Sequence, residues 1–79
     1  MRGIWRHYKG GKYRVLGIAR DADTMKPMVV YAGHPVSVNK TGIWVRSYDV
    51  FMGRVQYKGK TVDRFKNVFK EADTVKSNE

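Results

Sequence analysis

Short apolar runs separated by turn signals at intervals of about ten residues constrain the fold of this chain most. Gly10-Gly11, the polar stretch 21–24 and Lys58-Gly59 each interrupt a run rich in β-branched or aromatic residues. This spacing is typical of short antiparallel strands joined by tight turns. The 79-residue chain is therefore predicted to be all-β, a small barrel or roll of five to six short strands.

The opening stretch, residues 3–20, predicts two strands joined by a tight turn at Lys9-Gly10-Gly11, because glycine adopts positive φ at little cost. Val15–Ala19 is apolar on both faces of an extended strand, which predicts a strand without a wet face. A second hairpin turn is predicted at Lys58-Gly59. The fragments Tyr8-Lys9-Gly10 and Tyr57-Lys58-Gly59 resemble each other, which we interpret as shared turn chemistry.

The middle of the chain predicts further strands, one beginning at Pro27 and another over Ile43–Arg46. One helical turn is expected near residues 47–52, capped by Ser47 and ended by Gly53.

At the C-terminal end, Val68, Phe69 and Ala72 fall at helical spacing, so a short helix is possible there. We expect one barrel domain over residues 1–67 and an extension over residues 68–79, partly helical or frayed.

Charge and composition narrow the classes of partner. Sixteen basic and seven acidic residues give a net charge of +9, which favours nucleic acid, nucleotides or an acidic protein surface. The chain has no cysteine, so disulfides and thiolate sites are excluded. It has no apolar run approaching the roughly eighteen residues of a membrane span. We expect a cytoplasmic protein without membrane contact, as a monomer or small homo-oligomer.

Few residues of the chain could support catalysis. His7 and His34 are the two histidines, and a structural role is the simpler interpretation of each. Asp21 and Asp23 share a loop, but a metal ion needs more ligands than this pair supplies. We therefore expect no catalytic residue, metal site or cofactor, and no enzymatic activity.

Several sequence blocks resemble one known family. The blocks are Gly3–Gly10, Tyr13–Arg20, Pro27–Tyr31, Ile43–Arg46, Phe51 and Arg64-Phe65. In this order they resemble the small bacterial and phage family called domain of unknown function 1653, over roughly Gly3 to Phe65. The resemblance implies an SH3-like β-barrel and implies no activity.

Cationic and aromatic residues alternate in a way that indicates binding. Arginine holds phosphate through two hydrogen bonds, and an aromatic ring stacks on a base. We expect the basic residues of the opening hairpin and of the tryptophan-bearing strand to meet on one exposed surface. The candidate ligand-binding residues are Arg6, Tyr8, Lys9, Arg20, Trp44 and Arg46.

The competing interpretation places the aromatic residues in the core. About half of the set formed by Trp5, Tyr13, Tyr31, Trp44 and Phe51 is expected to be buried. Within that set, Tyr13, Tyr31 and Phe51 are the most core-like.

Two functions remain open. The first is a non-enzymatic module that binds an anionic ligand, either nucleic acid or a nucleotide, through the basic and aromatic surface. The second is a protein–protein adaptor or phage-type inhibitor that docks on an acidic host protein or pairs through a sheet edge.

Overall fold

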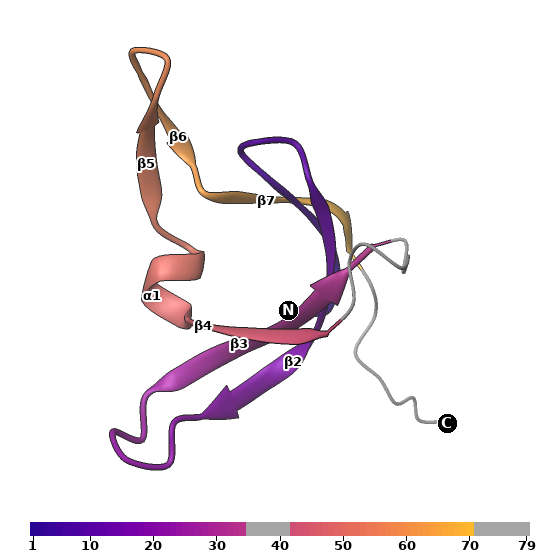
Figure 1. Cartoon of the computed structure of the whole chain (residues 1–79), viewed down its shortest axis with the longest axis vertical. Coiled ribbons are helices and arrows are strands. Elements are labelled where there is room, and N and C mark those ends of the chain that lie inside the picture. Colours follow the sequence, from indigo (N-terminus) through magenta and orange to yellow (C-terminus); the bar gives the residue numbers. More distant parts are fainter. Residues whose placement is uncertain (35–41, 71–79) are drawn as a thin grey trace.

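The computed structural model describes residues 1–34 and 42–70 of the chain. Within them the elements are β1 (Gly3–His7), β2 (Lys12–Arg20), β3 (Pro27–Gly33), β4 (Ile43–Ser47), α1 (Tyr48–Phe51), β5 (Arg54–Tyr57), β6 (Lys60–Asp63) and β7 (Phe65–Lys70) (Figure 1). The all-β prediction is confirmed. The described part contains seven strands rather than five or six, and these strands form two sheets without closing a barrel.

Five strands form one antiparallel sheet in the order β4-β3-β2-β1-β7, and β5 pairs with β6 in a separate hairpin. Both predicted turns are confirmed. Gly10 has φ +108° in the first turn, and Lys58 and Gly59 have φ +51° and +78° in the second. In the second turn both central residues have positive φ, and this type of turn has a twist that matches the twist of the two strands it joins. Both hairpin tips lie at the same end of the molecule (Figure 1).

The predicted helical turn is confirmed as α1. The Ser47 side chain accepts a hydrogen bond from the Val50 N–H at 3.3 Å, which satisfies one of the free donors at the helix start. The Gly53 N–H then donates to the Val50 carbonyl at 3.1 Å, and β5 begins at Arg54. This turn carries Phe51 into the core.

The predicted C-terminal helix is wrong for residues 68–70, which belong to strand β7. This strand pairs with β1 from His7↔Phe65 to Gly3↔Lys70, with a bulge between Ile4 and Trp5. One side of β1 is paired with β2, and the backbone N–H and C=O groups on its other side form hydrogen bonds with β7. The free energy of these hydrogen bonds exceeds the weak helical preference of the segment that contains Val68 and Phe69. The remainder of that prediction, including Ala72, lies outside the described residues.

The core is a compact group of rings and branched side chains on the inner face of the sheet. Its buried members are Trp5, Val15, Val29, Tyr31, Phe51 and Phe65. The Phe51 and Phe65 rings stack with centroids 4.0 Å apart. Tyr31 and Phe51 are buried as predicted and Tyr13 packs against the core, whereas Trp44 is 53% exposed.

The strand over Val15–Ala19 has a wet face, against the prediction. Leu16 and Ile18 are 40% and 48% exposed. The register between β2 and β3 shifts between Val15 and Gly17, so Leu16 is the extra residue of a bulge. No helix within the described ranges is long and apolar enough to cross a membrane.

Candidate functional site: two hollows on either side of His7

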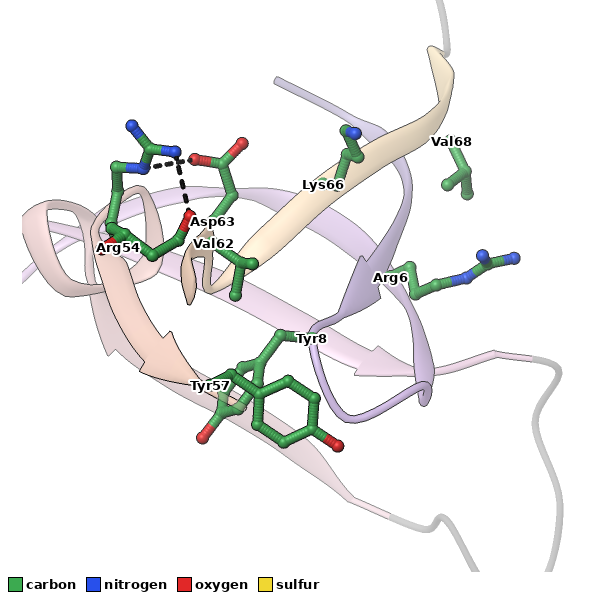
Figure 2. Close-up of a pocket in the computed structure, with 9 residues that line it drawn as sticks. Arg6, Tyr8, Arg54, Tyr57, Val62, Asp63, Lys66 and Val68 are labelled. Carbon is green, nitrogen blue, oxygen red and sulfur yellow. Dashed lines mark hydrogen bonds and ion pairs between the residues drawn. The ribbon is translucent and has the colours of Figure 1, made fainter. Parts of the chain in front are cut away.

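The first hollow, which we call the tip hollow, lies between the β5–β6 hairpin and the paired strands β1 and β7 (Figure 2). Its volume is about 360 Å³. It is lined by Arg6, Tyr8, Arg54, Tyr57, Thr61, Val62, Asp63, Lys66 and Val68. The two hairpin turns of similar sequence thus contribute to one site, which is formed from segments almost fifty residues apart.

Two tyrosines form the aromatic part of the tip hollow. The Tyr8 and Tyr57 rings meet edge to face, with centroids 5.1 Å apart. The ammonium nitrogen of Lys9 lies 5.8 Å from the Tyr8 centroid, and that of Lys58 lies 5.3 Å from the Tyr57 centroid. Each ring therefore carries a cation over it, and the tyrosine pair lies in a positive field.

The rest of the lining adds positive charge. Arg6 and Lys66 are cross-strand partners, so their side chains leave the same face of the sheet and project on one side of the hollow (Figure 2). On the other side the Arg54 Nε lies 3.5 Å from the Asp63 carboxylate, in an exposed ion pair. Because Asp63 offsets Arg54, the excess charge of the lining comes from Arg6 and Lys66.

The second hollow, which we call the arginine hollow, lies on the inner face of the sheet. It has a volume of about 200 Å³ and is lined by Tyr13, Tyr31, Trp44 and Arg46. Trp44 is the cross-strand partner of Tyr31, and Arg46 is that of the buried Val29, which places both β4 side chains on the inner face. The Arg46 Nε donates to the Tyr31 hydroxyl at 3.2 Å, and its guanidinium carbon lies 5.9 Å from the Phe65 centroid.

His7 lies between the two hollows. Its ring contacts Tyr8 on one side and Phe65 on the other, with centroid distances of 4.5 Å and 5.0 Å. Partial burial lowers the pKa of His7, and the positive charges of Arg46, Arg64 and Lys9 lower it further. The Lys9 N–H donates to Nδ1 at 3.2 Å, which requires that nitrogen to be unprotonated. Burial is thus the main cause of the lowered pKa of His7, and the neighbouring cations add to it.

The predicted site residues fall into two groups rather than one. Arg6 and Tyr8 line the tip hollow with Lys9 above Tyr8, while Trp44 and Arg46 line the arginine hollow. Arg20 lines neither of these hollows, and its Nη1 donates to the Met25 carbonyl at 2.8 Å.

The sequence prediction missed Tyr57 and Lys66, which line the tip hollow, and Lys58, which lies over the Tyr57 ring. The repeated Tyr-Lys-Gly fragment was the signal for the first two, and it is explained by the contact between the two turns. Lys66 lies sixty residues from its partner Arg6, so no local pattern in the sequence indicated that they would meet.

The Asp21 carboxylate acts within its own loop. It accepts hydrogen bonds from the backbone N–H groups of Asp23 and Thr24 at 2.8 Å and 2.9 Å. The Thr24 bond, followed by that of Asp23, lowers the pKa of Asp21. Its role is that of an acceptor which closes the turn between β2 and β3.

Comparison with known proteins identifies the family. The family model described as "Protein of unknown function (DUF1653)" matches residues 3–67. The crystal structure of a protein of that family from Bordetella bronchiseptica is similar, with a TM-score of 0.75, 28% sequence identity and 94% of each chain covered. A comparison with curated proteins gave no match. The chain therefore belongs to the DUF1653 family, as its sequence blocks indicate.

Proposed function

We propose that this protein is a non-enzymatic module that binds single-stranded nucleic acid, with the tip hollow as its main contact surface. The observation that supports this most is the Tyr8–Tyr57 pair, in which each ring has a lysine above it. Binding of single strands without strong sequence preference combines aromatic stacking platforms with cations along the backbone path.

The lining supplies both parts, with tyrosine rings from the two turns and cations from β1 and β7. Bases stack on the tyrosine rings, displacing Lys9 and Lys58 toward the adjacent phosphates, and Arg6 and Lys66 hold the next phosphates along β1 and β7. A duplex keeps its bases stacked on each other, so the tyrosines would find no free base face. Single strands are therefore the expected ligand.

Fluorescence anisotropy with a labelled eight-nucleotide thymidine strand tests this proposal. Tyr8→Ala and Lys66→Gln should each weaken binding, while Arg20→Gln, which removes the same charge outside both hollows, should leave it within about twofold of the wild type. Equal losses for Lys66→Gln and Arg20→Gln would mean that only net charge matters. Tight binding with a flat salt dependence would instead indicate a pocket for a small nucleotide.

A protein partner is the alternative, and the edge strand β4 favours it. β4 is the last strand of its sheet, and its first three side chains, Ile43, Trp44 and Val45, are 67%, 53% and 60% exposed. Such an edge can pair with a strand of an acidic host protein. A pull-down from lysate before and after nuclease treatment separates the two functions, because a protein captured equally in both supports the adaptor.

A further inference from the structure

The arginine hollow has a different chemistry from the tip hollow. Its volume of about 200 Å³ lies below the roughly 300–1,000 Å³ of pockets that enclose a whole small ligand. It therefore suits a single planar group. Three of its four lining side chains are aromatic rings, and Trp44 is 53% exposed, so one broad ring is available for stacking.

Arg46 and the Tyr31 hydroxyl can each donate a hydrogen bond to a ligand in this hollow. Arg46 has no acceptor, and its Nε is already committed to the Tyr31 hydroxyl. That bond fixes the guanidinium plane and leaves the two terminal nitrogens as a donor pair. In the part of the chain that the structure describes, no carboxylate forms an ion pair with Arg46. Tyr31 accepts from Arg46, so its own hydroxyl hydrogen remains to be donated.

We propose that the arginine hollow is a base pocket that takes a guanine from the bound single strand. The guanine stacks on Trp44, and its O6 and N7 accept hydrogen bonds from the terminal nitrogens of Arg46. Guanine presents these two acceptors side by side, and a bidentate arginine is their usual partner. Adenine places an amino donor beside N7, which would face the donors of Arg46.

Contacts through His7 connect the tip hollow with the arginine hollow. His7 contacts Tyr8, which lines the tip hollow, and Phe65, over which Arg46 lies. This inference rests on the proposed function, because a base reaches the pocket as part of a bound strand. It adds a preference for one base, which the tyrosine pair does not supply.

The first experiment compares eight-nucleotide thymidine strands that carry one central guanine, adenine or cytosine, at one salt concentration. The guanine strand should bind about tenfold tighter than the adenine strand, since a good bidentate contact discriminates by that order. It should also bind tighter than the cytosine strand, whose smaller ring stacks over less of Trp44. Binding of either competitor within twofold of the guanine strand overturns the base pocket while leaving the proposed function intact.

Variants of the pocket identify the residue that is responsible for the preference for guanine. Arg46→Lys keeps the charge but loses the fork, so the guanine preference should vanish while the plain thymidine strand still binds. Trp44→Phe offers a smaller stacking ring and should weaken binding of the guanine strand without removing its preference over adenine, whereas Arg20→Gln, which lies outside both hollows, should leave the preference unchanged. Near-ultraviolet circular dichroism checks that each variant is folded. A preference that survives in folded Arg46→Lys overturns the assignment.

Free nucleotides give a readout that does not need a strand. Trp44 is exposed and Trp5 is buried, so guanosine monophosphate in the pocket should quench the Trp44 fluorescence more than adenosine monophosphate does. The quenching should be lost in Trp44→Phe. If no oligonucleotide binds, the proposed function fails, and this titration alone decides the pocket: saturable quenching selective for guanine supports it, and its absence overturns it.

Discussion

The aromatic core and the tip hollow use the same kinds of side chain in opposite ways. In the core, Phe51 and Phe65 stack face to face at 4.0 Å and are nearly inaccessible to solvent. At the tip hollow, Tyr8 and Tyr57 meet edge to face with lysines above them. Rings that exclude water stabilise the fold, whereas rings beside cations at the surface are available to a ligand. The environment of each ring, and not its type, decides its role.

The largest expected effect is the loss of stability when a ring of the core is removed. Phe51→Ala should lower the free energy of unfolding by about 3–5 kcal/mol, because it removes a fully buried ring and leaves a cavity. That is most of the stability of a domain this small. Urea unfolding followed by circular dichroism measures it. If Phe51→Ala does not fold, Phe51→Leu should lower the free energy of unfolding by about 0.5–3 kcal/mol. A wild-type midpoint for Phe51→Leu would contradict the core assignment.

The next largest effect is the loss of binding when a tyrosine of the tip hollow is removed. Tyr57→Ala should weaken single-strand binding by about 1–3 kcal/mol, the usual loss when a stacking ring is removed. Its effect on unfolding should stay below about 1.5 kcal/mol, because the packing it removes is mainly one edge-to-face pair. Anisotropy and urea unfolding of the same preparation measure both. A variant that unfolds as easily as Phe51→Ala would place Tyr57 with the core.

A smaller effect concerns the two lysines. The double variant Lys9→Gln and Lys58→Gln should reduce the slope of log affinity against log salt by about 0.7 for each phosphate that is no longer neutralised. Tyrosine stacking should persist, so binding at low salt should fall less than in Tyr57→Ala. Anisotropy titrations over a range of salt give the slope. An unchanged slope would show that these lysines do not bind phosphate.

The smallest effect is on pH dependence. The pKa of His7 is lowered in the folded state, so the unfolded chain takes up this proton more readily as the pH falls. The contribution of neutral His7 to stability is complete above the ordinary pKa of about 6.5. It is lost as the pH falls from there through the lowered pKa. Unfolding midpoints at pH 7.5 and 5.5 should differ less in His7→Gln than in the wild type, and an equal difference would contradict this linkage.

The local part of the fold was predictable because it depends on neighbouring residues. Positive φ at Gly10 and Gly59, and the cap that Ser47 provides for α1, are set within a few residues of chain. The helical spacing of Val68 and Phe69 misled, because the alternative was pairing with β1, more than sixty residues earlier in the sequence. Contacts at that separation leave no local signal.

The candidate site was predictable in its residue types and not in its grouping. Four of the predicted residues line a hollow, namely Arg6 and Tyr8 the tip hollow and Trp44 and Arg46 the arginine hollow. Nothing in the sequence indicates that these two pairs belong to different hollows. Trp5 and Trp44 have similar flanking residues, and only packing makes one buried and the other 53% exposed.

The sequence by itself determined an antiparallel all-β chain, its hairpin turns and a large excess of positive charge, because turn chemistry, strand propensity and charge are properties of short segments. The tertiary structure alone decided that the two Tyr-Lys-Gly turns meet and that Arg46 is held by Tyr31. Those contacts join segments far apart in the chain, and their formation depends on how the whole sheet curves and pairs.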